Sequence, residues 1–321
     1  MPEEDTTVAV FGAGGKLGRH LLPLLSKRAM NCRALVHKTP LKDTNATSIA
    51  GSITEAEAVN EVVNGADIVV QMATMKEDAD EFFDVSIKGT FNVLEACRHQ
   101  RVKQFILVGG DAAFGIWFYP QPEPINEDHE LAAYPGYYAF SKVIEESMTR
   151  QYEIQYGVPT TILRSSWVQE NDDLLNHFSL LKNVDPTEKG HGFGEVDDQT
   201  LALVKNGKER IPILIDRDGN PFRRHVVHID DVMQSFDKMI GNPQALGSSF
   251  NIAAPAAFDY REAANHLSAK TGIPTHDISC PDYHSFSIDI SKAQREIGYA
   301  PENDIFTMLD RALEYRKQTN E

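Results

Sequence analysis

Short apolar runs alternate with segments of helical periodicity through the first half of the chain, and this alternation restricts the fold more than any other feature. The runs cover residues 7–11, 32–36, 68–72, 105–108 and 160–164. Between the first two, leucines recur at helical spacing from Leu17 to Leu25. Strands that alternate with helices form right-handed βαβ units, whose parallel strands are covered by helices on both faces. The sequence therefore predicts an α/β fold around a doubly wound parallel sheet.

The second half of the chain is less regular. Beyond Trp167, residues 169–199 are polar, acidic and rich in helix breakers, which predicts the start of a smaller lobe. The segments 225–240 and 250–254 then predict a return to the main sheet, and a helical tail is expected from Tyr260 onward. We therefore expect one main domain and a smaller lobe built from separate stretches of the chain.

Composition and charge restrict the partners of the chain. Its 47 acidic and 31 basic residues give a net charge of −16, which disfavours nonspecific binding to nucleic acid or to an anionic membrane, because both need Lys and Arg. The apolar run at 8–11 is too short for a signal peptide or a membrane span. Three widely spaced cysteines, Cys32, Cys97 and Cys280, fit neither a disulfide framework nor a zinc site. The sequence predicts a cytoplasmic protein with no metal site.

Three glycines follow the first expected strand. Gly12, Gly15 and Gly18 stand three residues apart, just before the leucine-periodic helix. Glycine permits a tight turn and lets the backbone approach a pyrophosphate at the positive end of that helix. A plain strand-to-helix turn is the alternative, but the position between a strand and a helix favours a dinucleotide site.

The end of the second strand indicates which dinucleotide is bound. An acidic residue there would hold the ribose 2′-hydroxyl of NAD, yet the position holds His37, followed by Lys38. With Arg33 in the same run and Arg19 past the last glycine, positive charge could instead meet the 2′-phosphate of NADP. Solvated surface cations are the alternative. We expect NADP or NAD, with NADP preferred, and Ser52 as an adenine contact.

The stretch YPGYYAFSKVIEE at 134–146 carries the strongest indication of chemistry. Tyr138 and Lys142 are four residues apart and so share one face of a helix. A phenol with a pKa of about 10 exchanges protons poorly near neutrality, but an adjacent ammonium stabilises the phenolate and lowers that pKa. An exposed helix face is the alternative for an isolated pair. Together with the glycine loop and the alternating strands, the pair predicts proton transfer to or from a carbinol.

In these motifs, over nearly the whole chain, the sequence resembles the extended short-chain dehydrogenase/reductase family, also called the NAD-dependent epimerase/dehydratase family. The resemblance also rests on IKGTFNVLEAC at 87–97, VKQFILV at 102–108, INEDHEL at 125–131, YGVPTTILR at 156–164, VVHIDDV at 226–232, FNIAAP at 250–255 and IDISKAQREIGYAP at 288–301. It implies a Rossmann dinucleotide-binding domain and a substrate-binding lobe. The domain is expected at 1–166 with a return segment at about 225–253, and the lobe at 167–224 and 254–321. A homodimer through a four-helix bundle is also implied.

The resemblance assigns residues to the chemistry and to the cofactor. Tyr138 is expected as the acid/base and Lys142 as its ribose-binding partner. The expected cofactor contacts are Gly12, Gly14, Gly15, Lys16, Leu17, Gly18, His37, Lys38, Ser52, Ile53, Met72, Ala73, Thr74, Tyr138 and Lys142.

The chain departs from the family pattern after the run at 105–108. Relatives usually place a Ser or Thr there, whose hydroxyl holds the substrate oxygen beside the tyrosine. Here that position is Gly110, which offers only its backbone amide. Asp111 coincides with a catalytic aspartate of the sugar 4,6-dehydratases, but the glutamate that follows it there is Ala112. Asp111 is therefore either a substrate contact or a turn-capping carboxylate. We expect Gly110 to make room for a substrate or a water.

Other candidate substrate contacts follow from their position in the chain. Thr74 and Ser165 follow or end strands, where they could contact substrate or only satisfy the backbone. Trp117 lies in the loop after Gly110, where an aromatic ring could stack on a sugar or anchor the loop. The resemblance implies that Arg223 or Arg224 could bind an anionic substrate, and we select Arg223.

These residues favour an NAD(P)-dependent oxidoreductase that acts on a hydroxyl/carbonyl carbon of a sugar, sugar acid or related polyol, with Tyr138 moving the proton. One alternative is a nucleotide-sugar epimerase, or a 4,6-dehydratase-like enzyme, that retains its NAD. A second is a non-catalytic regulator that senses NADP. Retention of both Tyr138 and Lys142 argues against the regulator, because a sensor has no chemical use for them.

Overall fold

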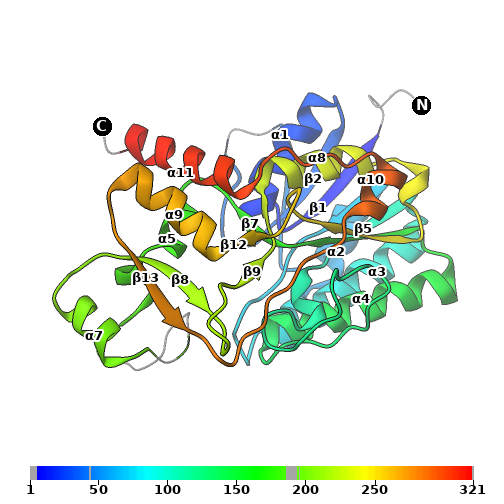
Figure 1. Cartoon of the computed structure of the whole chain (residues 1–321). Helices are drawn as coiled ribbons and strands as arrows, with labels where there is room; N and C mark the ends of the chain where they lie inside the picture. The colour runs from blue at the N-terminus through cyan, green and yellow to red at the C-terminus, as the bar shows by residue number, and fades with distance from the viewer. Residues whose placement is uncertain (1–5, 43–44, 186–193, 195, 320–321) are drawn as a thin grey trace.

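The computed structural model describes residues 6–42, 45–185, 194 and 196–319, and a seven-stranded parallel sheet lies at its centre (Figure 1). The strands are β1 Thr7–Phe11, β2 Asn31–Val36, β3 Thr47–Ala50, β4 Ile68–Gln71, β5 Gln104–Val108, β6 Thr160–Ser165 and β11 Ser248–Ile252. Their order is β11-β6-β5-β4-β1-β2-β3. This order confirms the predicted Rossmann-like sheet. It reverses between β1 and β4, the place where such sheets bind ligands.

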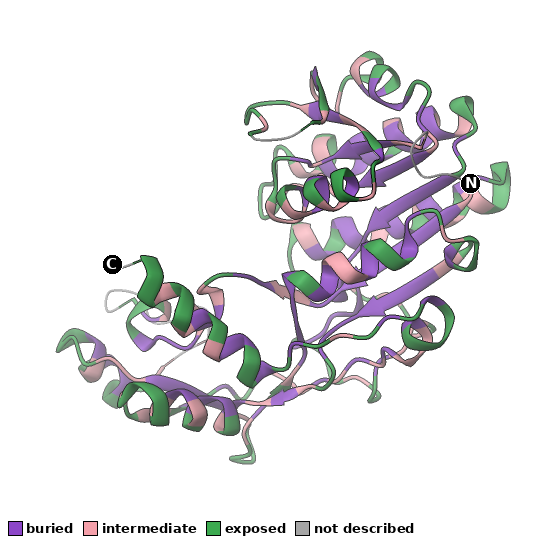
Figure 2. Cartoon of the chain, turned by 90° about the horizontal axis from the view of Figure 1, so that it is seen from above, coloured by how far each residue is buried: buried purple, intermediate pink, exposed green. Residues whose placement is uncertain are grey.

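Helices cover both faces of the sheet (Figures 1 and 2). On one face, α1 packs against α8, and on the other α2, α3 and α4 lie side by side. A π-helical turn, η2, leads into α3. The bounds are α1 Lys16–Lys27, α2 Ala56–Val63, η2 Phe83–Lys88, α3 Gly89–Gln100, α4 Tyr137–Tyr156, α8 Ile229–Met239 and α10 Ser291–Ile297.

Alternation along β1 explains why both faces need helices. Val8 and Val10 lie in one hydrophobic core together with Leu21 of α1. Ala9 and Phe11 lie in a second core, which includes side chains of α2 and α3. Neighbouring residues of a strand face opposite sides of the sheet. A strand that is apolar on both sides, as this one is, becomes stable only when both sides are covered.

The smaller lobe contains short helices and a second pair of parallel strands. Its elements are α5 Asp173–His177, α6 Leu180–Asn183, α7 Asp198–Lys205, β8 Ile211–Ile215, β9 Arg223–Arg224, β12 Phe258–Asp259, α9 Tyr260–Thr271, β13 Thr275–Ser279 and α11 Ile305–Thr319, with η4 Pro243–Ala245 before β11. β8 pairs with β13, and β9 pairs with β12. The expected helical tail is therefore interrupted by a strand. Within the polar stretch at 169–199, residues 186–193 and 195 lie outside the described residues.

The predicted return to the main sheet is correct for residues 250–254 and correct only in part for 225–240, where α8 packs on the sheet beside α1 but the strand before it does not join the sheet. β11 joins the sheet beside β6. In contrast, β10 (Val226–His228) pairs with β7 (Trp167–Gln169) outside the main sheet. Since β11 occupies the edge next to β6, β10 satisfies its backbone groups on β7, which follows β6 directly in the chain.

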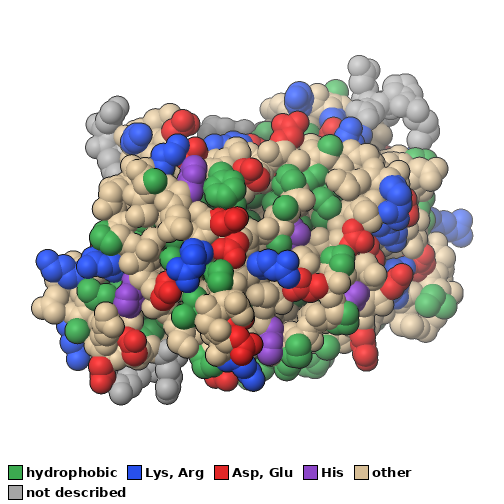
Figure 3. Space-filling model, viewed as in Figure 1, with side chains coloured by type: hydrophobic (Ala, Val, Ile, Leu, Met, Phe, Trp, Pro, Cys, Tyr) green, Lys and Arg blue, Asp and Glu red, His purple; other side chains and the backbone are tan. Residues whose placement is uncertain are grey.

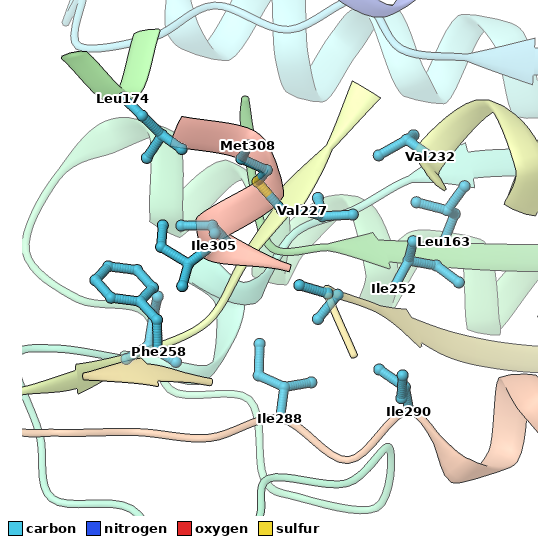
Figure 4. Close-up of a cluster of buried hydrophobic side chains, with 14 of the residues drawn as sticks. Leu163, Leu174, Val227, Val232, Ile252, Phe258, Ile288, Ile290, Ile305 and Met308 are labelled. Carbon is cyan, nitrogen blue, oxygen red and sulfur yellow. The ribbon is translucent and has the colours of Figure 1, made fainter. Parts of the chain in front are cut away.

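One hydrophobic cluster joins the sheet to the lobe. Figure 4 shows a continuous cluster that includes Leu163 of β6 and Ile252 of β11 at one side and Phe258 and Met308 of the lobe at the other. All four side chains are buried. Burial of each large apolar side chain contributes about 1.5–3 kcal/mol, so this shared core fixes the lobe against the sheet.

Charges are mixed on the outer surface. Figure 3 shows acidic and basic side chains interspersed over the face in view, so the net charge of −16 does not gather there into one patch. Within the part of the chain that the structure describes, no helix is both long and apolar enough to span a lipid bilayer.

Candidate active site

A cavity of about 1160 Å³ lies where the central strands end. Its lining consists of two different sets of residues, which we call the loop end and the lobe end. The loop end comprises residues 12–17, 36–39, 52–54 and 72–74. The lobe end comprises Asp111, Trp117, Tyr134, Trp167 and Arg224. Tyr138 and Lys142 of α4 line the same cavity.

The glycine loop brings the backbone of the loop end close to β4. Gly12 has a φ of +85°, and a Cβ on it would lie 2.8 Å from the Ala73 nitrogen. A Cβ on Gly18 would overlap the Ala13 carbonyl. Gly15 donates a backbone hydrogen bond to the Gly12 carbonyl, at 3.0 Å, and no side chain caps α1. The amides of the first helical turn therefore form a site suited to the pyrophosphate of a dinucleotide.

Four basic residues were expected near the 2′-phosphate of NADP, and the structure places two of them at the loop end. His37 and Lys38 line the cavity. Arg33 instead donates to a backbone carbonyl of α2 at 2.6 Å, and Arg19 forms an ion pair with Glu170 at 2.9 Å. Neither arginine lines the cavity. The expectation for these two was wrong because each finds a closer partner that the sequence order did not reveal.

The other expected cofactor contacts gather at the loop end, apart from Gly18, which packs beneath the loop. The set that lines the cavity is Gly12, Gly14, Gly15, Lys16, Leu17, Ser52, Ile53, Met72, Ala73 and Thr74. Lys16 reaches across to the lobe, where its Nζ pairs with Asp173 at 2.5 Å. The residues present thus fit a dinucleotide along the ends of β1, β2 and β4.

Tyr138 is buried in an environment that opposes its ionisation. Burial raises the pKa of Tyr138, the nearby Lys142 lowers it, and Asp111 and Glu145 raise it again, so that it stays above the usual 10. The Lys142 Nζ lies 5.5 Å from the centroid of the Tyr138 ring. The sequence argument considered only the ammonium, whereas the fold adds two carboxylates that act against it.

Lys142 is held by two acceptors. Its Nζ donates to the Val108 carbonyl at 3.2 Å and to Glu145 Oε2 at 2.9 Å. Burial alone would lower the pKa of Lys142, but Glu145 and Tyr138 outweigh that effect and raise it. Lys142 is therefore a fixed ammonium beside the phenol.

Gly110 leaves space directly beside the phenol. Its φ of −177° is ordinary extended backbone that any residue adopts. A Cβ on Gly110 would lie 3.6 Å from the Tyr138 hydroxyl and 3.7 Å from the Ser165 carbonyl, both ordinary contacts. A larger side chain would therefore fill the space next to Tyr138 without backbone strain.

Asp111 is a buried carboxyl at the lobe end. The Ser166 hydroxyl lies 2.8 Å from Asp111 Oδ2, to which it can donate, and 2.9 Å from the His225 carbonyl. Burial raises the pKa of Asp111 to about 6, although Ser166 and Arg224 both act to lower it. A carboxyl with this pKa exchanges its proton close to neutral pH, which a surface aspartate does not.

Three other candidates have well-defined surroundings. Thr74 lines the cavity, and its hydroxyl lies 3.3 Å from that of Ser86. Ser165, at the end of β6, also lines the cavity. Trp117 is 9% exposed and packs 4.9 Å from the Phe222 ring, centroid to centroid. Trp117 therefore both lines the cavity and anchors its loop in the lobe.

Arg224, and not Arg223, faces the cavity. The Arg223 side chain is 55% exposed and pairs with Glu123 at 2.7 Å. The Arg224 guanidinium carbon lies 4.5 Å from the Trp167 ring centroid and 5.1 Å from that of Trp117. Its Nε is buried with no hydrogen-bond partner among the described residues. Adjacent strand residues point to opposite sides, so the arginine pair could indicate one inward side chain but not which one.

Sequence reasoning also missed two residues of the lobe end. Tyr134 and Trp167 line the cavity beside Arg224. They come from separate parts of the chain, and no spacing rule connects them. The nearest signal was the aromatic content of the loop around Trp117.

Comparison with known proteins gives a consistent family. The model of the NAD dependent epimerase/dehydratase family matches residues 8–253. A protein of similar structure is a short-chain dehydrogenase/reductase superfamily protein from Agrobacterium tumefaciens with bound NAD. It has a TM-score of 0.85 and 21% identity, and the match covers 98% of each chain. At this identity the likeness concerns the fold.

Two curated relatives are similar in sequence over part of their length. The L-arabinose 1-dehydrogenase (NAD(P)(+)) of Haloferax volcanii is 26% identical over 179 residues, which cover 52% of this chain and 69% of the relative. The dTDP-D-glucose 4,6-dehydratase of Dictyostelium discoideum is 23% identical over 285 residues, covering 77% of this chain and 59% of the relative. The match thus spans between about three fifths and two thirds of these relatives.

Proposed function

The chain belongs to the NAD-dependent epimerase/dehydratase family, and on this premise we propose that it is an NAD(P)-dependent oxidoreductase. It interconverts a hydroxyl and a carbonyl group on a sugar, sugar acid or related polyol. The observation that carries the proposal is the Tyr138–Lys142 pair in the wall of a cavity whose loop end fits a dinucleotide. A substrate bound in this cavity would then lie next to both the acid/base Tyr138 and the cofactor site.

The chemistry divides between the cofactor and this pair. A bound nicotinamide dinucleotide accepts or supplies the hydride. In oxidation the Tyr138 phenolate takes the hydroxyl proton of the substrate, and in reduction the Tyr138 phenol gives a proton to the carbonyl oxygen. Lys142 stabilises the phenolate and would bind the ribose of the dinucleotide. Gly110 leaves the substrate oxygen room beside the phenol, with Thr74 and Ser165 as nearby polar contacts.

We propose NADP as the preferred cofactor, with NAD as the weaker one. Support comes from His37 and Lys38, which line the loop end just after β2. Both can meet a 2′-phosphate. No residue from 36 to 39 is acidic, so this segment supplies no carboxylate for the 2′-hydroxyl of NAD.

We propose that the substrate carries an anionic group that binds Arg224. The indole rings of Trp117 and Trp167 hold the guanidinium near the cavity through cation–π contacts with its planar faces. Its Nε remains without a hydrogen-bond partner among the described residues. A carboxylate matches the planar donors of a guanidinium, which favours a sugar acid. Trp117 offers an apolar ring to the same substrate.

The alternative is an epimerase or a 4,6-dehydratase-like enzyme that retains its cofactor. Asp111 is the observation that favours it, because a buried carboxyl with a pKa of about 6 is suited to a second proton transfer. In that case Arg224 binds the diphosphate of a nucleotide sugar.

A regulator that senses NADP is the second alternative. In such a protein Tyr138 and Lys142 would have no catalytic role.

We propose a cytoplasmic homodimer. Aromatic side chains are exposed on α3 and α4: Phe91 is 47% exposed and Phe140 48%. Next to them, Phe82 stacks on Tyr137 with ring centroids 4.9 Å apart. Burying this surface against the same surface of a second copy would form a bundle of four helices. Sedimentation equilibrium tests the dimer.

The cytoplasmic location is supported by the three free cysteines, which suit a reducing compartment.

The test of the proposed function is Tyr138→Phe. Purified wild-type protein is mixed with NADP⁺ or NAD⁺ and a panel of aldoses, hexuronates and polyols, and reduced cofactor is followed by absorbance. We expect Tyr138→Phe to lower turnover about 10²–10⁴-fold while cofactor binding stays unchanged. Conversion of substrate without net cofactor reduction supports the epimerase. Equal activity of the two proteins would refute the assignment of Tyr138.

A further inference from the structure

Two adjacent carboxylates on α4 have different partners. Glu146 accepts from Arg164 Nε through both of its oxygens, at 3.2 and 3.0 Å. Glu145 accepts from Lys142 through Oε2 alone, while its Oε1 is buried with no hydrogen-bond partner among the described residues. The side chains of Glu145 and Lys142 are 1% and 3% exposed. The charge of Glu146 is therefore compensated by a guanidinium, whereas that of Glu145 acts on Lys142 and its surroundings.

Holding Lys142 in place does not by itself require a carboxylate. The Val108 carbonyl already accepts a hydrogen bond from its Nζ, and a neutral acceptor at position 145 would provide another. A buried charge with one unpaired oxygen is costly to the fold. Burial accordingly raises the pKa of Glu145, although Lys142 opposes this. The negative charge of Glu145 therefore needs an explanation beyond packing.

The ionisable groups around Tyr138 come from three elements. Lys142 and Glu145 lie on α4 itself, Asp111 on η3 (Asp111–Phe114), and Tyr134 just before α4. Lys142 favours the phenolate, while both carboxylates disfavour it. At 2.9 Å from Lys142, Glu145 offsets part of the field that this ammonium exerts on the phenol, and Asp111 has a larger effect in the same direction.

Two further charged groups, Glu146 and Arg224, lie near the groups that surround Tyr138, and each interacts with other partners. Glu146 pairs with Arg164 at 2.8 Å, although it still raises the pKa of both Lys142 and Glu145. Arg224 lies between two indole rings and acts on Asp111 and Tyr260, but it is not among the groups that shift the pKa of Tyr138. Glu145 is thus the charge on α4 that can change the balance between Lys142 and Tyr138 without taking part in another ion pair described here.

Resting on the proposed function, we propose that Glu145 is a positioning residue that acts through Lys142. It holds the ammonium against the Val108 carbonyl and offsets part of its charge, and so keeps Tyr138 in the phenol form at neutral pH. Tyr138 is then ready to donate a proton, which is its role when a carbonyl is reduced. Oxidation of the alcohol needs the phenolate and becomes faster as the pH rises.

Glu145→Gln tests this directly, because the amide keeps the shape and an acceptor for Lys142 but removes the charge. Ionisation of Tyr138 is followed by tyrosinate absorbance in the presence of NADP⁺, as the difference between each protein and its Tyr138→Phe counterpart. We expect the midpoint to fall by about one pH unit. The pH profile of kcat/KM, on whichever substrate of the panel the wild type oxidises, should move in the same direction.

Two variants serve as controls. Glu153→Gln changes a carboxylate on the same helix that pairs with Arg150 and Thr160 instead, and it should leave the midpoint unchanged. Glu145→Asp keeps the charge and should keep most of the wild-type midpoint.

The outcomes separate this proposal from the proposed function. A midpoint that stays the same in Glu145→Gln overturns the role of Glu145, even if Tyr138→Phe is inactive. Full activity of Tyr138→Phe overturns the proposed function instead. If Glu145→Gln does not fold, Glu145→Met, which also removes the charge at similar size, decides: a midpoint equal to that of the wild type means that Glu145 is only structural.

Discussion

The two ends of the cavity are built on different physical principles. At the loop end, the backbone and side chains that follow four consecutive strands form the lining, and Gly12 has no room for a Cβ. At the lobe end, large side chains from distant segments meet around Arg224 and Asp111. The loop end presents a surface common to any dinucleotide, whereas the lobe end presents side chains that can differ without changing the fold. We therefore expect the loop end to determine the class of cofactor and the lobe end the class of substrate.

The largest expected effect comes from closing the loop end with Gly12→Ala. The added Cβ would lie 2.8 Å from the Ala73 nitrogen, in a backbone conformation with a φ of +85°. Losing one or two backbone hydrogen bonds to the pyrophosphate, each worth about 1.5–3 kcal/mol, is expected to weaken cofactor binding about 100-fold. Isothermal titration with NADP⁺ measures it.

Gly65→Ala is the matched control for Gly12→Ala. Gly65 also has a positive φ, +73°, but its Cβ would meet nothing within 4 Å. It should therefore show the cost of backbone strain alone, with cofactor affinity close to that of the wild type. If both variants bind NADP⁺ equally well, close approach of the backbone is not what the loop end requires.

At the lobe end, Arg224→Ala should raise KM for an anionic substrate about 10–100-fold, because a charge-assisted hydrogen bond is lost. Arg223→Ala changes the neighbouring arginine, which pairs with Glu123 outside the cavity, and should have little effect. Steady-state kinetics on hexuronates and on the corresponding neutral aldoses distinguish the two. Equal loss on both classes of sugar would contradict a role in anion binding. Strong inhibition by UDP that Arg224→Ala relieves would favour the nucleotide-sugar alternative.

A smaller effect is expected from His37→Asp, which introduces the carboxylate that the end of β2 lacks. The variant should repel a 2′-phosphate and accept a hydrogen bond from a 2′-hydroxyl, which changes the NADP/NAD affinity ratio about 10-fold toward NAD. Separate titrations of NADP⁺ and NAD⁺ into wild type and variant measure the ratio. Tighter binding of NAD than of NADP to the wild type would show that the preference proposed for His37 and Lys38 is mistaken.

Asp111→Asn should act on the stability of the fold, and in the favourable direction. Because the pKa of Asp111 is raised from 3.8 to about 6 in the folded protein, its contribution to stability is fully present below about pH 4 and is lost as the pH rises through 6. At pH 8 the buried charge costs up to about 3 kcal/mol. We expect Asp111→Asn to raise Tm by a few degrees at pH 8 and to lose this advantage near pH 4.

Differential scanning calorimetry across this pH range tests the prediction, with the exposed Asp282→Asn as control. A pH-independent gain would mean that packing, not charge, limits stability at Asp111. If turnover falls while Tm rises, the carboxyl serves the substrate at the expense of the fold, as a catalytic group would.

The loop end could be predicted almost completely from the sequence, and the lobe end only in part. Gly12 and His37 follow directly after strands, so their place at the sheet edge is determined by local chain order. Arg224 and Trp167 are 57 positions apart by residue number, and nothing in their spacing indicates that they touch. Position alone led to Arg223, because a two-residue strand can place either neighbour inward.

The sequence by itself determined the parallel sheet, the glycine loop and the shared helical face of Tyr138 and Lys142. Each depends on residues close together in the chain, where strand alternation, helical periodicity and the conformational freedom of glycine act. Only the tertiary structure decided which arginine lines the cavity and which carboxylates face Tyr138. Those contacts arise when β5, α4 and the lobe pack together, and the burial that results sets the charges of Asp111, Tyr138 and Glu145, which no local pattern encodes.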